Sequence, residues 1–291
     1  GVVYEGIHEG LGRRTAIKVL RPTASAGGDA METARREARL AASAGHPNIV
    51  DVLDMGATEE GIPYIVMEHL DGSPLGDVLR RMGRLGTADS IAVAMHVLDA
   101  LDAVHQRGIV HGDLKPDNVF LAIDPAGACV AKILDFGLSQ LGGHSGGRRG
   151  TGGPGRIAGT IGYMAPEQAI GGCALDHRAD IFATGVVLYR MLTGRLPFDV
   201  STRPEYVAAL ASSVPVPPGE IVPLPDGLQE IVMRAIAREA AERWGSASSF
   251  EAALAPVFDA IGGRPSRTEK VKLLEATIPF VRAQRETRGR S

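Results

Sequence analysis

The sequence predicts an α+β protein with two lobes, in which a small antiparallel sheet with one helix is followed by a larger, mostly helical lobe. Short β-rich runs dominate residues 1–70, helical periodicity dominates residues 71–258, and the turn-forming pair Asp71-Gly72 separates them. The 291 residues are 44% hydrophobic and 22% charged, which is ordinary for a folded chain with one large core or two small ones.

The first lobe, residues 1–70, is expected to hold short strands and one helix. The predicted strands cover residues 2–7, 15–20, 49–55 and 62–68. Residues 29–44 are rich in Ala, Glu and Arg and predict a helix, which Gly45 and Pro47 end. The chain begins abruptly in the first strand and without an initiator Met, so we expect a fragment of a longer protein whose first strand is missing.

The second lobe, residues 71–258, is expected to be mostly helical, with a hinge to the first lobe near residues 68–72. The predicted helices cover residues 87–106, 179–192, 228–238 and 246–260. The helix at 179–192 is apolar all round and should be buried. Short strands are predicted near 119–121 and 132–134, and loops at 140–158 and 214–225.

Charge and cysteine content argue against several classes of protein. A net charge of -3 gives no strong field to attract nucleic acid, so no nucleic-acid partner is expected. Cys129 and Cys173 are too few for a disulfide framework, which favours a reducing, cytoplasmic compartment. The sequence lacks an apolar run of the roughly 18 residues that a membrane helix needs.

A basic tail follows the second lobe at residues 259–291. From residue 264 onward it holds eight Arg or Lys against three Glu. A solvated tail or surface helix explains this composition, and so does a juxtamembrane segment of a membrane-anchored parent, because basic runs favour anionic lipid. Both interpretations stay open, as does dimerisation.

The strongest chemical signal is the run from His111 to Asn118, which reads H-G-D-L-K-P-D-N. Phosphoryl transfer needs a base to orient the attacking hydroxyl, a cation to neutralise charge on the moving group, and an oxygen ligand for Mg²⁺. Asp113, Lys115 and Asn118 supply these three groups in order within one loop. Asp135 of Asp135-Phe136-Gly137 follows 22 residues after Asp113 and offers a second oxygen ligand for the metal ion.

These motifs resemble those of the Hanks-type protein kinases, in their bacterial eukaryotic-like serine/threonine class, over residues 1–258. The resemblance implies a two-lobed protein-kinase fold that binds ATP with Mg²⁺, or alternatively Mn²⁺. It also implies transfer of the γ-phosphoryl group to serine and threonine hydroxyls of proteins, including autophosphorylation. Lys18 of Ala16-Ile17-Lys18 resembles the lysine that binds the α- and β-phosphates, and Glu37 the glutamate that pairs with it.

The resemblance assigns the site residues one by one. It gives a catalytic role to Asp113, Lys115, Lys18 and Glu37, and metal binding to Asn118 and Asp135. It places the nucleotide against Gly1, Val3, Ala16, Lys18, Met67, Glu68, Leu70, Asn118, Phe120 and Asp135. Gly1 resembles the last glycine of the phosphate-covering loop, and since its two earlier glycines are missing we expect weak ATP binding by this chain.

The segment 159–167 resembles the one on which protein substrates dock. There Thr160 would bond to Asp113 and Lys115, as in serine/threonine-directed relatives. Glu167 would form a buried ion pair with Arg243, and Asp180 would cap the backbone of the catalytic loop.

Regulation by loop phosphorylation is the point at which the sequence departs from many relatives. Gly112 stands where they carry an arginine that grips a loop phosphate, so we expect activity to depend little on loop phosphorylation. Ser139, Ser145 and Thr151 are candidate autophosphorylation sites.

Two other classes of function compete with this one. A pseudokinase would act by binding alone, but such proteins typically lose the lysine, the catalytic aspartate or the metal aspartate, and Lys18, Asp113 and Asp135 are all present. A small-molecule kinase of related fold would lack the docking segment around Ala165-Pro166-Glu167.

Overall fold

The computed structural model describes residues 2–20, 44–124, 127–135, 161–171, 175–200 and 202–262. Its strands are β1 (Val2–His8), β2 (Arg13–Val19), β3 (Val52–Ala57), β4 (Pro63–Glu68), β5 (Gly72–Pro74), β6 (Val119–Ile123) and β7 (Cys129–Ile133). Its helices are α2 (Leu75–Met82), α3 (Thr87–His105), α4 (Pro166–Ile170), α5 (Arg178–Thr193), α6 (Arg203–Ser212), α7 (Leu228–Ala235) and α8 (Ala247–Ala260).

The N-terminal lobe is built on an antiparallel sheet with the strand order β1-β2-β4-β3. Successive side chains of a strand point to opposite faces, so Arg14, Ala16 and Lys18 of β2 share one face. Lys18 lies opposite Val3 of β1 on one side and Ile65 of β4 on the other. One face of the sheet thereby presents a row of β2 side chains to the space between the lobes.

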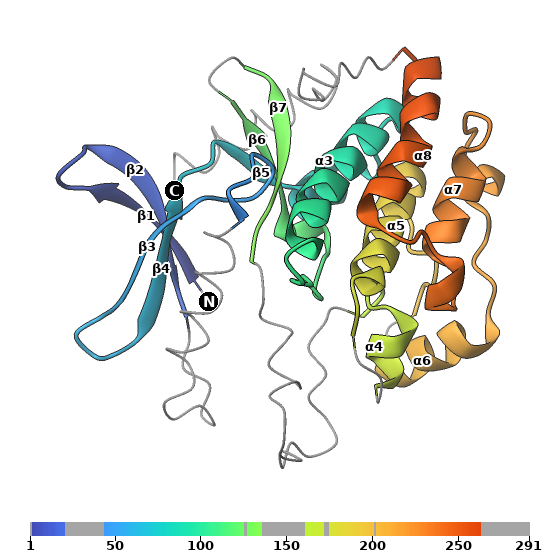
Figure 1. Cartoon of the computed structure of the whole chain (residues 1–291), viewed down its shortest axis with the longest axis horizontal. Helices are drawn as coiled ribbons and strands as arrows, with labels where there is room; N and C mark the ends of the chain where they lie inside the picture. Colours follow the sequence, from blue (N-terminus) through green and yellow to red (C-terminus); the bar gives the residue numbers. More distant parts are fainter. Residues whose placement is uncertain are drawn as a thin grey trace.

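A second, smaller sheet of order β5-β6-β7 lies between the N-terminal sheet and the helices, as Figure 1 shows. Gly72 begins it with φ of 153°, and a Cβ at this position would come within 2.0 Å of the Leu121 carbonyl oxygen. Only glycine has both the conformational freedom and the space for this close approach. The glycine therefore allows the chain to leave the hinge and join β6 directly.

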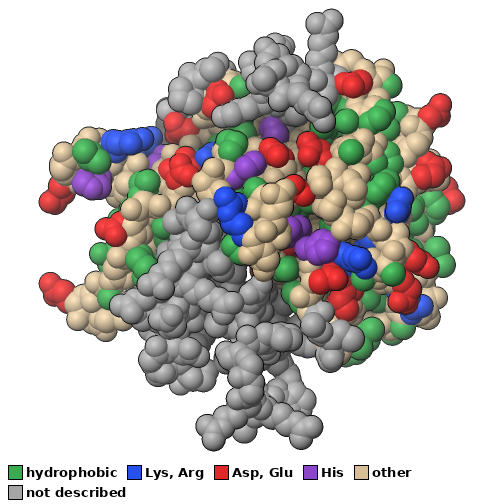
Figure 2. All heavy atoms as spheres, in the orientation of Figure 1, with side chains coloured by type: hydrophobic (Ala, Val, Ile, Leu, Met, Phe, Trp, Pro, Cys, Tyr) green, Lys and Arg blue, Asp and Glu red, His purple; other side chains and the backbone are tan. Residues whose placement is uncertain are grey.

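The C-terminal lobe has its core around α3, α5 and α8. Figure 1 shows α5 enclosed between α3 and α7, and its residues from Ala179 to Tyr189 are all buried. This confirms the burial expected from its apolar composition. Figure 2 shows acidic, basic and hydrophobic side chains interspersed over the visible face of this lobe.

Several elements differ from the sequence prediction. The strand expected at 49–55 begins only at Val52, because Ile49 and Val50 instead meet Ile133 at the end of β7. The helix expected at 228–238 ends at Ala235. The short elements β5, α2, α4 and α6 were not predicted, and the expected helix 29–44 lies outside the described residues except for Ala44.

The described residues include no helix that is both long and apolar enough to cross a membrane.

Candidate active site

A cleft of about 950 Å³ opens between the N-terminal sheet and β5–β7. Its apolar walls come from both lobes, with Val3 and Ala16 on the strands β1 and β2, Met67 at the end of β4, and Phe120 and Leu134 from the C-terminal lobe. The volume lies in the range that small-molecule and cofactor sites occupy. Apolar walls on two sides suit an aromatic ring such as a purine.

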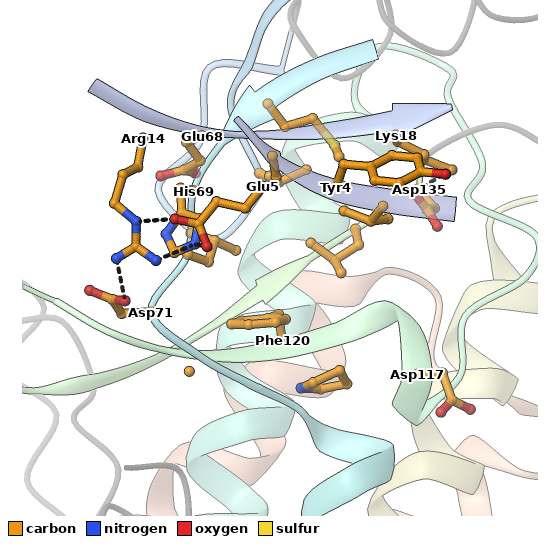
Figure 3. Close-up of a pocket in the computed structure, with 18 residues that line it drawn as sticks. Tyr4, Glu5, Arg14, Lys18, Glu68, His69, Asp71, Asp117, Phe120 and Asp135 are labelled. Atoms are coloured by element: carbon orange, nitrogen blue, oxygen red, sulfur yellow. Dashed lines mark hydrogen bonds and ion pairs between the residues drawn. The ribbon is translucent and has the colours of Figure 1, made fainter. Parts of the chain in front are cut away.

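An ion pair joins the two lobes at one end of the cleft (Figure 3). The Nζ atom of Lys18 lies 2.6 Å from Oδ1 of Asp135, and Lys18 is only 6% exposed. A buried ammonium group is costly unless it is paired, so the carboxylate stabilises the charged lysine. Where a polyphosphate enters, the same ammonium can bind its oxygens.

Asp135 is held in an unusual backbone conformation. Its φ is 57°, the only positive φ of a non-glycine among the described residues. Aspartate tolerates the left-handed region better than most residues, but the conformation still costs free energy. Such strain typically marks a functional position, and here it directs the carboxylate into the cleft beside Lys18 (Figure 3).

The loop from His111 to Asn118 places three functional side chains together. Lys115 Nζ lies 2.9 Å from Oδ2 of Asp113, and Asn118 Nδ2 donates a 2.8 Å hydrogen bond to the Asp113 carbonyl oxygen. This bond fixes the Asn118 amide, whose Oδ1 remains as an acceptor. The loop therefore presents a carboxylate paired with an ammonium group, and an amide whose orientation is fixed by the same aspartate.

Asp180, which is fully buried on α5, holds this loop in place through hydrogen bonds to its backbone. Its two carboxylate oxygens accept hydrogen bonds of 2.8 Å from the backbone N–H groups of His111 and Gly112, and His105 contacts it at 2.8 Å. Burial alone would raise the pKa of Asp180, but the hydrogen bond to His105 and the nearby backbone donors hold it below the ordinary value. The predicted cap on the catalytic loop is confirmed.

Gly112 takes a φ of 71° at the same point. Glycine adopts this conformation freely, and it turns both backbone groups towards partners. Its carbonyl oxygen accepts a 2.8 Å hydrogen bond from Gln168 of α4. The loop is thus tied to α4 as well as to α5, while the expected independence from loop phosphorylation stays a prediction.

The predicted ion pair between Glu167 of α4 and Arg243 is confirmed. The Nη1 and Nη2 atoms of Arg243 each lie 2.8 Å from one carboxylate oxygen of Glu167, which is the bidentate geometry that arginine favours. Three carbonyl oxygens also accept from the same buried guanidinium group; they belong to Ala237, Arg178 and Arg238. Arg243 thereby holds α4, next to the catalytic loop, against the helical core.

The structure brings most of the predicted nucleotide residues into the cleft. Its lining includes Val3, Ala16, Lys18, Met67, Glu68, Leu70, Phe120 and Asp135. Asn118 lies in the adjacent loop, next to Asp117, which does line the cleft. Gly1, Glu37 and Thr160 lie outside the described residues, so their assigned roles stay predictions.

Other residues of the cleft were not assigned to it by residue number from the sequence. His69, Asp71 and Gly72 fall within the predicted hinge, and the rest are Tyr4, Glu5, Arg14, Val50, Pro74, Asp117 and Leu134. Arg14 could have been found, because it precedes Ala16 by two residues and so shares its face of the strand. The others depend on how the hinge and the two sheets are arranged in space, for which the sequence has no local signal.

The donor groups fit a hard divalent cation bound together with a polyphosphate. Asp135 and Asn118 offer oxygen atoms, which such ions prefer, and no cluster of three or more His, Cys, Asp or Glu suited to a metal occurs within the described ranges. Magnesium is typically held by one or two carboxylates plus substrate phosphates rather than by an all-protein cage. The site therefore has the donors for such an ion when nucleotide is present.

The two lobes enclose a cleft whose lining suits a nucleotide and a divalent cation. A family model described as "Protein kinase domain" matches residues 1–248, so the chain belongs to the protein kinase family. The family uses ATP and a divalent metal ion and acts on protein substrates.

Curated bacterial proteins are similar over most of this chain. A protein named serine/threonine-protein kinase Pkn1 from Myxococcus xanthus is 36% identical over 100% of this chain and 42% of its own length. A probable serine/threonine-protein kinase PknB from Bifidobacterium longum is 35% identical over 86% of this chain and 36% of its own length. The chain spans less than half the length of these relatives.

The solved structures agree with this family. The kinase domain of Mycobacterium tuberculosis PknI superposes with a TM-score of 0.65 at 29% identity, and the match covers 87% of this chain and 90% of that domain. The arrangement of an antiparallel N-terminal sheet and a helical C-terminal lobe is that of the family.

Proposed function

We propose that this chain transfers the γ-phosphoryl group of Mg-ATP to serine and threonine hydroxyls of protein substrates. The observation that carries the proposal is the catalytic loop, in which Asp113, Lys115 and Asn118 are held together by contacts of 2.8–2.9 Å and fastened to α5 by Asp180. The names of the similar bacterial kinases support serine and threonine as the acceptors. Because ATP is a cytoplasmic metabolite, the proposal places the domain in the cytoplasm.

Each residue of the site has a distinct part in this reaction. The Asp113 carboxylate accepts the hydrogen bond of the substrate hydroxyl and orients its oxygen for attack. Lys115, 2.9 Å from that carboxylate, stabilises negative charge on the phosphoryl group as it moves. Lys18 binds the phosphates from the N-terminal lobe while the apolar walls around Met67 hold the purine.

Asn118 and Asp135 would hold the divalent cation, which supplies charge neutralisation at the phosphates when it is bound. The two residues come from opposite ends of the β6–β7 hairpin, where Leu134 N donates a 2.8 Å hydrogen bond to the Asn118 carbonyl oxygen. This backbone bond brings the chain just before Asp135 alongside Asn118. Their spacing therefore depends on the hairpin rather than on a flexible loop.

The substitution Asp113→Asn tests the proposal. It keeps the shape of the side chain but removes the negative charge, so we expect at least a hundredfold loss of turnover with little change in melting temperature. Intact-mass spectrometry after incubation with Mg-ATP measures autophosphorylation, and labelled ATP with a basic protein substrate measures transfer to another chain.

Asp226→Asn is the matched control, because Asp226 is an exposed aspartate in the turn before α7. This variant should keep full activity. Normal rates in Asp113→Asn would refute the assigned role, and absence of phosphoryl transfer by the unaltered, folded protein would favour a pseudokinase that acts by binding.

A further inference from the structure

The end of the cleft opposite the Lys18–Asp135 pair carries a second charged group (Figure 3). The Nε atom of Arg14 lies 2.6 Å from Oε1 of Glu5, and its Nη1 lies 3.7 Å from Oδ1 of Asp71. The remaining nitrogen, Nη2, lies 3.2 Å from Nε2 of His69. All three nitrogens of one guanidinium group are thus engaged, by three side chains of the cleft.

The partners of Arg14 belong to different lobes. Glu5 lies on β1, directly opposite Ala16 of β2, and moves with the N-terminal sheet. Asp71 is fastened to the C-terminal lobe, because its carbonyl oxygen accepts a 2.7 Å hydrogen bond from Ile123 N on β6. The next residue, Gly72, already pairs with Ala122. Arg14 therefore crosses from one lobe to the other at the mouth of the cleft.

Both ends of the cleft are consequently bridged, but by groups of different burial. The Lys18 side chain is buried and that of Asp135 is partly buried, whereas the side chains of Arg14 and Glu5 are 48% and 55% exposed. An exposed pair is individually weak and is screened by salt. Here one arginine joins carboxylates of both lobes, so a change in the spacing of the lobes disrupts it.

We propose that Arg14 is a positioning residue that, through Glu5 and Asp71, latches the two lobes together at the hinge-side mouth and slows the escape of the bound adenine nucleotide. This outer latch, defined as Glu5, Arg14 and Asp71, rests on the proposed function for the identity of the ligand. It lies at the end of the cleft away from Asp135, and thus away from the reacting phosphoryl group (Figure 3). Its loss should affect nucleotide affinity rather than the chemical step.

Binding of a fluorescent ATP analogue with Mg²⁺ tests the latch in Arg14→Ala, Asp71→Asn and the double variant. Each single substitution should weaken binding about three- to tenfold, mainly through faster dissociation, and the double variant should be no weaker than the worse single one. The KM for ATP should rise by the same factor while kcat changes less than twofold. Arg14→Lys should restore part of the affinity, and raising the salt from 0.1 M to 0.5 M should reduce the differences, because it shortens the screening length about twofold.

Arg13→Ala is the matched control, since Arg13 is the exposed neighbour on β2 whose side chain points to the opposite face. It should bind the analogue as the unaltered protein does. Strictly additive losses in the double variant, or an equal loss in Arg13→Ala, would overturn the latch. Equal affinity in Arg14→Ala and the unaltered protein would overturn the latch alone, whereas no binding by the unaltered protein would overturn both the latch and the proposed nucleotide site.

Discussion

Three carboxylates share a small surface where α3 meets α8. Glu251 is half-buried there. Burial, together with the charges of Asp99 and Asp102, raises its pKa to about 7, and the nearby His46 lowers that pKa only slightly. His46 instead lies 3.3 Å from Asp99 and lowers the pKa of that residue. The protein therefore carries an acid that titrates near neutral pH far from the catalytic cleft.

This pKa predicts how stability depends on pH. Between about pH 4.5 and pH 7, Glu251 is ionised in the unfolded chain but stays protonated in the folded protein. The stability that the protonated form contributes is therefore fully present below about pH 4.5, and it is lost as the pH rises through about 7. Glu251→Gln should stabilise the protein by about 1 kcal/mol at pH 8, because solvent reaches the side chain and weakens the effect, and by nothing at pH 4.

Urea unfolding of both proteins at the two pH values measures the difference. Glu230→Gln, at an exposed position of α7, provides the comparison for a simple change of net charge. If Glu251→Gln increased the free energy of unfolding equally at pH 4 and pH 8, the raised pKa of Glu251 would be contradicted.

At the scale of single residues, the sequence predicted the catalytic loop because its chemistry is contiguous. Asp113, Lys115 and Asn118 stand within six positions, so their proximity needs no knowledge of the fold. The outer latch could not be predicted in this way. Arg14 and Asp71 meet only because the register of β2 and β4 and the path of the hinge bring them together.

Among the elements, α4 depends on a tertiary contact rather than on its own helical stability. It is five residues long, far shorter than a helix that persists alone in water, and begins with Pro166. Its Glu167 is joined to the fully buried guanidinium group of Arg243. The ion pair therefore determines whether the segment beside the catalytic loop keeps its position.

Glu167→Gln should destabilise the protein by about 3 kcal/mol, because it leaves a buried guanidinium charge without its counter-ion. Thermal melting measures the loss, and activity should fall with it because Gln168 of the same helix supports Gly112. Arg80→Gln breaks an exposed pair with Asp77 and Asp117 instead, and should cost less than about 1 kcal/mol. Equal losses of stability in Glu167→Gln and Arg80→Gln would show that burial of the ion pair does not decide how much it stabilises the protein.

The long helices α3, α5 and α8 were predicted nearly to their ends, since the apolar periodicity of α3 and the all-round apolar composition of α5 extend over several turns. The short helices α2, α4 and α6, which have five to ten residues, were not predicted. Signals for two of them were present in the sequence. Pro166 begins α4 and Gly171 follows it, and Thr202 and Glu205 form a capping box at the start of α6.

For the whole molecule, the two lobes differ greatly in the size of their cores. The cluster in the C-terminal lobe joins α3, α5, α7 and α8, whereas the separate cluster of the N-terminal lobe has only Val50, Ile65 and Met67 as buried members among the described residues. Since burial of apolar surface is the dominant favourable term in folding, the N-terminal sheet should open locally at a lower free energy than the helical lobe.

Hydrogen–deuterium exchange measured with and without Mg-ATP tests this asymmetry. In the free protein, the amides of β1, β2 and β4 should exchange faster than those of α5, whose residues are buried all round. Nucleotide contacts β1, β2 and β4 in the proposed complex, so a saturating amount should protect these strands about tenfold or more and leave α5 almost unchanged. Protection that rises equally in both lobes would mean that they unfold as one cooperative unit, and that the small core does not limit the stability of the nucleotide site.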